Sequence, residues 1–342
     1  MLELYEPEGA FEALEDYLAP FWGRAAVVAD LYLGYGLSAA LRRDGHPSPA
    51  EPCALPLLAC RVRETGGAER VSTVGYELGE WERSWDDDGY AAAIEAVRAA
   101  IGRGDVYQAN LVQHLAAPYA GDPWALALGL RHLHPLHPRP FVGHGWAVVS
   151  ASPELFLARR GARLVTSPIK GTRPAGVDVE GEKDGAEHVM IVDLERNDLA
   201  RVCEPGSVTW PELMTQRELA GVTHLVSTVE GTIRPDVSLG EILAATFPGG
   251  SVTGAPKIAA VDLIAALEPV GRGAAMGAVG TVRPDGDFEL ALTIRTLAAA
   301  EGRIHLWVGG GIVWDSDPEA EIEESWVKAR PLLRAVGGLV PA

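Results

Sequence analysis

Three apolar runs near the C-terminus, separated by turn signals, constrain the fold of this chain more than any other feature. They span residues 277–282, 288–297 and 303–314. The segment Arg283-Pro-Asp-Gly-Asp287 is the clearest of the turns between them. Apolar runs bounded by Gly, Pro and Asp are typical of β-strands. The C-terminal part is therefore predicted to contribute three strands.

Further strands and helices are predicted along the rest of the chain. Residues 141–149 and 155–166 indicate antiparallel strands joined around Ser150-Ala-Ser-Pro-Glu154. Asp86-Asp-Asp-Gly precedes a helix over residues 90–101, which Gly102 and Gly104 end. Other strands are expected over residues 25–29, 71–78, 106–115 and 224–229, and other helices over residues 11–18, 124–132, 184–203, 239–247, 257–267 and 316–328.

The composition narrows the class of partner. The 342 residues carry 47 acidic and 29 basic side chains, a formal net charge of −18. This balance disfavours nucleic acid and anionic membrane surfaces, which select basic patches. An anionic substrate would require local basic groups, backbone amides or a metal ion.

Cysteine usage and the apolar stretches bear on the compartment. Cys53, Cys60 and Cys203 are odd in number and lack metal-site spacing, which is typical of reduced thiols. The N-terminus has no basic segment followed by a long apolar run. No apolar stretch reaches the ~18 residues that a membrane span requires. A cytoplasmic protein is expected.

The segment Pro168-Ile-Lys-Gly-Thr172 is the first candidate for chemistry. It places Lys170 between a β-branched residue and a glycine. A lysine becomes a nucleophile near neutral pH when it is desolvated or lies beside another cation. The alternative is an ordinary turn, because Gly and Pro commonly punctuate structure.

The last helix is the second candidate. Ser316 and Glu319 form a capping-box pattern, with Pro318 in the first turn. Glu321, Glu324 and Lys328 are three and four residues apart and therefore share one face. The carboxylates either stabilise the helix N-terminus or form a Mg²⁺ site together with Glu187.

Polar and glycine-rich segments elsewhere suggest where anions could bind. The loop 247–257 precedes a helix N-terminus, where free N–H groups accept anions. Gly309, Gly310 and Gly311 are expected to end a strand with three exposed amides that suit a carboxylate. Arg295 lies within an apolar run, where an unpaired guanidinium would be costly. Polar positions on the strand over 106–115 are either solvated or functional: Gln108, Asn110 and Gln113.

Taken together, these residues resemble the chorismate-utilising enzymes, over roughly residues 70–335. The shared blocks are Asp105-Val-Tyr-Gln, Ser152-Pro-Glu154, Pro168-Ile-Lys-Gly-Thr172, the segment from Glu187 to Leu199, His224-Leu-Val-Ser, Thr253-Gly-Ala-Pro-Lys257, Ala291-Leu-Thr-Ile-Arg295, Gly309-Gly-Gly-Ile and Glu321-Ile-Glu-Glu-Ser-Trp-Val-Lys-Ala. The resemblance is closest to component I of the 4-amino-4-deoxychorismate synthases, which act on the route to para-aminobenzoate and folate.

The resemblance implies a fold and a substrate site. The fold is one α/β (α+β) domain with two face-packed, mostly antiparallel sheets, helices outside and the site between the sheets. Residues 1–70 would be a shortened N-terminal part, and residues 71–337 the catalytic region. The implied Mg²⁺ ligands are Glu187 and Glu324, with Asp184 and Glu321 holding its waters. The implied substrate-binding groups are Gln108, Thr172, Ser251, Arg295, the Gly309–Gly311 amides and Lys328.

Two positions distinguish the subfamilies. Gln108 falls where isochorismate and salicylate enzymes place a water-activating lysine, so ammonia is the expected nucleophile. Lys170 falls where anthranilate synthases usually have alanine, and the resemblance implies that it attacks chorismate covalently. Glu154 would then be the acid/base partner. His224 is either the counterpart of a histidine associated with pyruvate loss or a structural residue.

Three further expectations follow from the resemblance. Ammonia would come from a separate glutamine amidotransferase subunit, because no such Cys/His pattern is present in this sequence. Ala275 stands where relatives commonly carry an aromatic residue, and the short N-terminal region argues against tryptophan binding. The alternatives are anthranilate synthase component I and a binding subunit without turnover.

Overall fold

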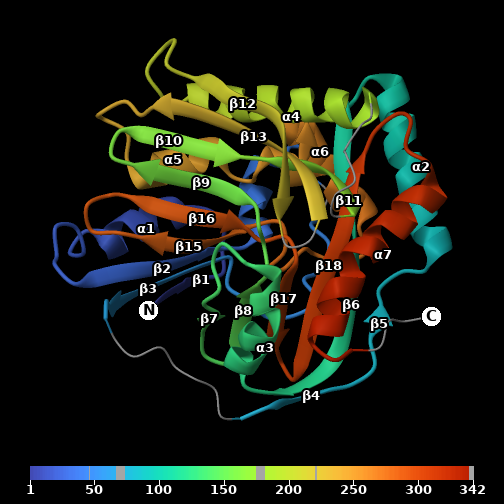
Figure 1. Ribbon diagram of the computed structural model, residues 1–342, viewed down its shortest axis with the longest axis horizontal. Coiled ribbons are helices and arrows are strands. Elements are labelled where there is room, and N and C mark those ends of the chain that lie inside the picture. Colours follow the sequence, from blue (N-terminus) through green and yellow to red (C-terminus); the bar gives the residue numbers. More distant parts are fainter. Residues whose placement is uncertain (46, 67–73, 175–181, 220–221, 339–342) are drawn as a thin grey trace.

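Two antiparallel β-sheets form the framework of the protein (Figure 1). The computed structural model describes residues 1–45, 47–66, 74–174, 182–219 and 222–338. Within these ranges, the side chains of residues 172–174, 182–184, 186–187, 218–219 and 222 are outside the description.

The larger sheet has ten strands in the order β1-β3-β2-β15-β16-β9-β10-β13-β11, with β12 also paired to β13. Its strands are β1 (Leu2–Leu4), β2 (Val27–Leu33), β3 (Leu58–Glu64), β9 (Leu155–Arg160), β10 (Arg163–Ser167), β11 (Ile169–Pro174), β12 (Thr209–Leu219), β13 (Val222–Thr232), β15 (Ala278–Val282) and β16 (Phe288–Leu292). The sheet therefore joins the N-terminal strands β1 to β3 to strands from much later in the chain.

The smaller sheet has eight strands in the order β14-β6-β18-β17-β8-β7, with β4 and β5 also paired to β6. Its strands are β4 (Tyr76–Leu78), β5 (Glu82–Arg83), β6 (Gln108–Gly121), β7 (Phe141–Val142), β8 (Trp146–Ser150), β14 (Gly254–Ala255), β17 (Thr296–Ala300) and β18 (Arg303–Ile312). The long antiparallel pair of β6 and β18 lies at its centre.

Helices cover the outer faces of the sheets. Helices α2 and α7 lie over the strands β6 and β18, at the right of Figure 1. The α-helices are α1 (Ala10–Leu18), α2 (Asp87–Arg103), α3 (Pro123–Leu130), α4 (Glu182–Ala200), α5 (Leu239–Thr246), α6 (Lys257–Leu267) and α7 (Pro318–Ala335). Short 3₁₀ helices span η1 (Tyr35–Leu41), η2 (Arg131–Leu133) and η3 (Gly250–Val252).

One large hydrophobic core packs the sheets against each other. It contains Tyr32 and Leu290 from the ten-stranded sheet and Val148 and Trp307 from the eight-stranded sheet, all buried. A second core joins the eight-stranded sheet to α7 through residues such as Trp326. The predicted fold, two face-packed and mostly antiparallel sheets with helices outside, is therefore confirmed.

The chain passes from one sheet to the other in two crossing segments, residues 151–154 and 293–295, and neither passage was predicted. Residues 141–149 and 155–166 were expected to be neighbouring antiparallel strands, but β8 lies in the smaller sheet and β9 in the larger one. The run 288–297 was expected to be one strand, but it divides into β16 and β17 in different sheets. Arg295 has a φ of 49° between them. Its left-handed conformation, rare for residues other than glycine, turns the chain from one sheet to the other.

The structure decides one open alternative and corrects one local prediction. The polar side chains of Gln108, Asn110 and Gln113 are buried, which excludes the solvated alternative. The N-cap of α7 is Asp317, which accepts a hydrogen bond from the Ala320 N–H at 3.0 Å. Ser316 instead accepts from the Val313 N–H at 3.0 Å and so closes the preceding turn.

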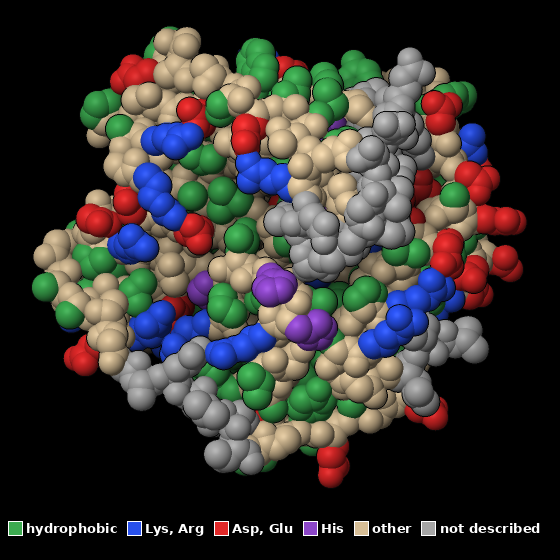
Figure 2. All heavy atoms as spheres, in the orientation of Figure 1, with side chains coloured by type: hydrophobic (Ala, Val, Ile, Leu, Met, Phe, Trp, Pro, Cys, Tyr) green, Lys and Arg blue, Asp and Glu red, His purple; other side chains and the backbone are tan. Residues whose placement is uncertain are grey.

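The surface charge and the helices bear on the classes of partner considered from composition. On the face in Figure 2, basic side chains are scattered among acidic and apolar ones and form no single continuous basic surface. In the part of the chain that is described, none of the helices is long and apolar enough to cross a membrane.

Candidate active site

A cavity of about 320 Å³ lies where the two sheets meet. Strands β11 and β13 of the larger sheet and β18 of the smaller one contribute to its wall, as do the two crossing segments, the η3 loop and α7. The predicted site residues that line it are Glu154, Lys170, His224, Ser251, Arg295, Gly309, Gly310, Gly311, Glu321, Glu324 and Lys328.

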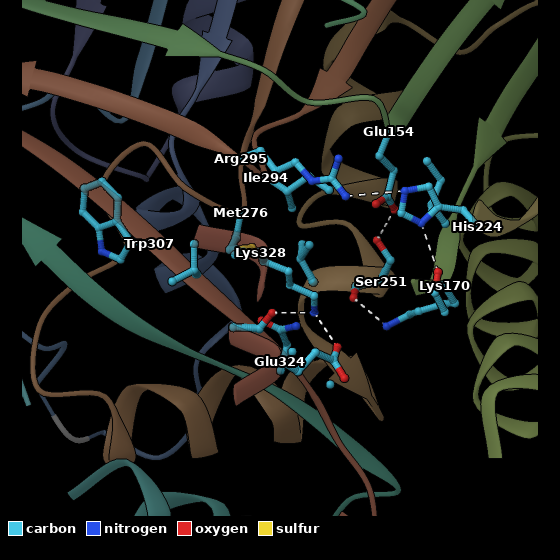
Figure 3. A pocket seen from close by; sticks show the side chains of 18 of the residues that line it. Glu154, Lys170, His224, Ser251, Met276, Ile294, Arg295, Trp307, Glu324 and Lys328 are labelled. Atoms are coloured by element: carbon cyan, nitrogen blue, oxygen red, sulfur yellow. Dashed lines mark hydrogen bonds and ion pairs between the residues drawn. The ribbon is translucent and has the colours of Figure 1, made fainter. Parts of the chain in front are cut away.

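Lys170 reaches this cavity from β11. The pairing of β11 with β13 is irregular between Lys170 and Thr172, and Gly171 has a φ of 60°. A glycine tolerates that left-handed conformation at little cost. The Lys170 Nζ donates a hydrogen bond to the Ser251 carbonyl oxygen at 3.3 Å (Figure 3). Lys170 is therefore held in the cavity, at an irregular point of β11. The segment is not an ordinary surface turn.

Glu154 lies beside Lys170 and is buried. Its Oε1 accepts a hydrogen bond from the Ser251 Oγ at 2.8 Å. Burial raises the pKa of the Glu154 carboxyl, although Ser251 and the positive charge of Lys170 oppose this shift. Ser251 thus contacts both groups, with its carbonyl on Lys170 and its hydroxyl on Glu154.

The two crossing segments hold Glu154 and Arg295 side by side. The Leu292 N–H donates to the Glu154 carbonyl at 3.0 Å, and the Ala151 N–H donates to the Arg295 carbonyl at 2.9 Å. These backbone bonds set the relative positions of a carboxyl group and a guanidinium that are distant in sequence.

His224 links Arg295 to β11. Its Nδ1 lies 3.0 Å from the Gly171 carbonyl oxygen, and the Arg295 Nη2 lies 3.5 Å from its Nε2 (Figure 3). Since a guanidinium only donates, Nε2 is the acceptor and Nδ1 carries the hydrogen. Burial lowers the pKa of His224. The imidazole is therefore neutral near neutral pH, and Nε2 faces the cavity as a weak base.

The opposite end of the cavity is acidic. The Lys328 Nζ contacts the Glu324 Oε1 at 2.7 Å and donates to the Gly309 carbonyl at 2.8 Å. A Cβ placed on Gly310 would lie 3.5 Å from an oxygen of Glu321 and 3.5 Å from an oxygen of Glu324. Two carboxylates and one ammonium therefore converge over Gly310.

The glycines themselves differ from the prediction. Gly309 to Gly311 lie near the end of β18, as predicted, but they pair with β6, so the three amides are not all exposed. Strand β17 pairs with β18 only up to Leu306. Alternate N–H groups of an antiparallel strand point away from its partner. Backbone groups at the β18 edge can therefore face the cavity, but not from three successive amides.

The predicted Mg²⁺ ligands are described only in part. Two carboxylates converging in one wall match the hard oxygen donors that Mg²⁺ prefers. The side chains of Asp184 and Glu187 lie outside the described residues. Among the described side chains, no group of three or more His, Cys, Asp or Glu could hold a metal ion. Glu321 and Glu324 are oxygen donors of the kind that Mg²⁺ accepts, and a Mg²⁺ site that also includes Glu187 and Asp184 stays a prediction.

Some predicted residues are not brought to the cavity wall. Gln108 is buried at the start of β6, whereas Asn110 lines the cavity from the same strand. The Thr172 side chain is outside the described residues. Ala275 is buried, and the next residue, Met276, reaches the cavity.

Sequence reasoning did not select the apolar part of the wall. It contains Pro153, Ile294, Met276 and Trp307. Pro153 and Ile294 adjoin selected residues, which is a usable signal. Met276 and Trp307 lie in ordinary apolar segments, and nothing local distinguishes them from core residues.

The comparison with known families decides the assignment. Residues 49–334 match the family described as chorismate binding enzyme. The chain belongs to this family. Among its curated relatives, the chain is 43% identical to "Anthranilate synthase component 1" of Thermus thermophilus over 280 residues. It is 40% identical to "Aminodeoxychorismate synthase component 1" of Klebsiella aerogenes over 269 residues.

The extent of these matches limits what they show. They cover 77% and 74% of this chain but only 60% and 59% of the relatives' own lengths. The crystal structure of anthranilate synthase component I from Streptococcus pneumoniae has a TM-score of 0.80 and 25% identity, covering 93% of this chain and 84% of that one. Both names occur among close relatives, so similarity leaves the reaction open between them.

Proposed function

We propose that this chorismate-binding protein converts chorismate to 4-amino-4-deoxychorismate, with ammonia as the nitrogen source. The observation that carries the proposal is Lys170, whose amine lies in the cavity with Glu154 and is joined to it through Ser251. Replacement of the C4 hydroxyl by an amino group benefits from a lysine nucleophile, because one difficult displacement becomes two easier ones.

The first step forms a covalent intermediate. The neutral Lys170 amine attacks C2 of chorismate, the ring double bond shifts, and the bond from C4 to its hydroxyl breaks. Glu154 supplies a proton to the departing oxygen, which leaves as water. The raised pKa of Glu154 favours the protonated form that this step requires.

The second step releases the lysine. Ammonia attacks C4, the double bond shifts back, and the bond between C2 and the Lys170 nitrogen breaks. The C4 ammonium group gives its one surplus proton to the Glu154 carboxylate, and the lysine nitrogen, which kept both of its protons in the intermediate, leaves as the neutral amine. We propose that a glutamine amidotransferase subunit supplies the ammonia.

Other groups would orient the dianionic substrate. Arg295 and Lys328 face the cavity and offer positive charge to its carboxylates. A Mg²⁺ ion held by Glu187 and Glu324, with Asp184 and Glu321 binding its waters, would neutralise the ring carboxylate when bound. These groups would allow a protein with a net charge of −18 to bind an anion locally.

Anthranilate synthesis is the second candidate. Its specific support is the neutral His224 in the cavity wall, available for proton transfer during pyruvate loss. That reaction needs no lysine nucleophile, so Lys170 would then serve only as a positive charge.

Product analysis tests the proposal. The protein is incubated with chorismate, Mg²⁺ and an ammonium salt at pH 8, and the products are separated and identified by mass spectrometry. Aminodeoxychorismate is the expected product. Anthranilate together with pyruvate would contradict the proposal and support the second candidate.

Glu154→Gln is expected to slow aminodeoxychorismate formation by about 10²–10⁴-fold, the usual contribution of a general acid. In the wild type, the rate should fall as pH rises through the raised pKa of Glu154, because the acid form is lost. The variant should lack this decline. The measurement is the initial rate from pH 4.5, the ordinary pKa of a glutamate, upward to the alkaline range in which the decline is complete.

Glu323→Gln serves as the control for this experiment. Glu323 pairs with Arg330 at 2.6 Å on the exposed face of α7 and does not line the cavity. It should keep the wild-type rate and pH profile. An unchanged rate in Glu154→Gln would show that Glu154 is not the general acid.

A further inference from the structure

The loop that carries Ser251 is held from α4 by a buried carboxyl group. Glu195 is 4% exposed, and its Oε1 accepts a hydrogen bond from the Gly250 N–H at 3.0 Å. Gly250 immediately precedes Ser251 in η3. Neither Glu195 nor Gly250 lines the cavity.

The fit between the loop and α4 is close. A Cβ on Gly250 would lie 2.6 Å from the Leu194 Cδ2 and 3.1 Å from the Glu195 Oε1. Only glycine leaves room for this approach without displacing a neighbour. The backbone before Ser251 therefore rests directly on the α4 surface.

A second contact holds the far end of the same loop. Asp198, one turn after Glu195 on α4, pairs with the Lys257 Nζ at 2.5 Å. The same Nζ donates to the Thr246 carbonyl at 3.0 Å. The loop 246–257 is thus held by α4 at Gly250 and at Lys257, and Glu195 is the contact nearer to Ser251.

We propose that Glu195 is a positioning residue for Lys170 and Glu154, acting through the Gly250-Ser251 peptide. Ser251 contacts Lys170 through its carbonyl at 3.3 Å and Glu154 through its hydroxyl at 2.8 Å. Displacing Gly250 would move both contacts together. The expected effect of Glu195 on the amination rate rests on the proposed function, whereas the geometry of the two Ser251 contacts does not.

Glu195 is suited to this task as a neutral acceptor. Burial, and then the Asp198 carboxylate, raise the pKa of Glu195 to about 8. The other charged groups that face it are Lys257 and Glu154. A neutral carboxyl group can be replaced by an amide of the same shape. Glu195→Gln should therefore keep the bond from Gly250, whereas Glu195→Leu removes it.

The matched control is Glu15 on α1. Its Oε1 accepts a hydrogen bond from the Gly240 N–H of α5 at 2.6 Å, the same kind of contact away from the cavity. Glu15→Leu removes a partly buried bond between a glutamate and a glycine N–H without touching the Ser251 segment. Gly250→Ala is a second test variant, which keeps Glu195 but pushes the loop away from Leu194.

The first measurement is the rate at which trinitrobenzenesulfonate labels Lys170, followed by peptide mass spectrometry and without any substrate. Glu195→Leu and Gly250→Ala should change this rate at least threefold while Lys328 keeps its wild-type rate. Glu195→Gln and Glu15→Leu should stay within twofold. Thermal unfolding of each variant confirms that the labelled protein is folded.

The second measurement is steady-state amination of chorismate. Glu195→Leu should lower kcat by about 10–100-fold, because small misplacements of reacting groups cost that much. KM should change less than threefold, since Arg295 and Lys328, which offer positive charge to the substrate, are untouched, and Glu195→Gln should restore kcat.

Two results would overturn the inference. One is wild-type Lys170 labelling in folded Glu195→Leu and Gly250→Ala proteins. The other is an equal change in Glu195→Leu and Glu15→Leu, which would indicate a general loss of stability. If the labelling differences appear in a protein that makes no aminodeoxychorismate, the proposed function fails and the positioning role stands.

Discussion

Lys170→Ala is expected to lose at least about 10³-fold of the aminodeoxychorismate-forming rate, because removal of a covalent nucleophile leaves only the slower direct displacement. Lys170→Arg should lose as much, since a guanidinium keeps the positive charge but does not act as a nucleophile. Rates are measured with chorismate, Mg²⁺ and ammonium by mass spectrometry of the products.

The pair of variants separates charge from covalent chemistry. If Lys170 only attracts the anionic substrate, the arginine variant should retain much of the activity, and the covalent step would be wrong. The wild-type protein with chorismate and no ammonia should also gain the mass of chorismate less one water. Neither variant should form that adduct, and digestion should place it on the peptide containing Lys170.

Removal of the divalent cation is expected to have the next largest effect. Chelation with EDTA, or Glu324→Gln, should reduce chorismate consumption by about 100-fold or more, because the ring carboxylate would lose its main counter-charge. Glu324 faces Lys328 and Glu321 over Gly310, so its carboxylate is placed for this role. Calorimetric titration with Mg²⁺ should show weaker binding by the variant.

Glu323→Gln is the matched control, because Glu323 is the adjacent residue of α7 but points to Arg330 on the exposed face. It should bind Mg²⁺ and consume chorismate as the wild type does. If the protein keeps full activity after complete chelation, and Glu324→Gln is as active as the wild type, the proposed role of Mg²⁺ is wrong.

Much of the candidate site could be predicted from sequence because its residues lie in short, chemically distinctive blocks. Lys170, Glu154 and Arg295 were selected from such blocks, and all three line one cavity. Gln108 was selected in the same way, but it is buried and does not line the cavity, whereas Asn110 does. A two-residue period assigns both side chains to one face of β6, but it does not say where along the strand the cavity begins.

The fold could be predicted as a class but not as a topology. Turn signals and alternating apolar residues located β15 and β18 within a few residues. They failed at β8 and β9, and again at β16 and β17, where the chain leaves one sheet for the other. Those crossings carry Glu154 and Arg295, so the places where local patterns failed are the places that form the site.

The sequence alone determined the secondary structure of most segments and the set of side chains able to do chemistry. It also led us to expect no basic binding surface. Local periodicity and residue chemistry suffice for these. Only the tertiary structure decided which sheet each strand joins, which carboxylates meet over Gly310, and that Glu195 supports Ser251. The reason is physical: these relations depend on pairing and packing between residues far apart in the chain, and no local pattern records which distant partner buries a given face.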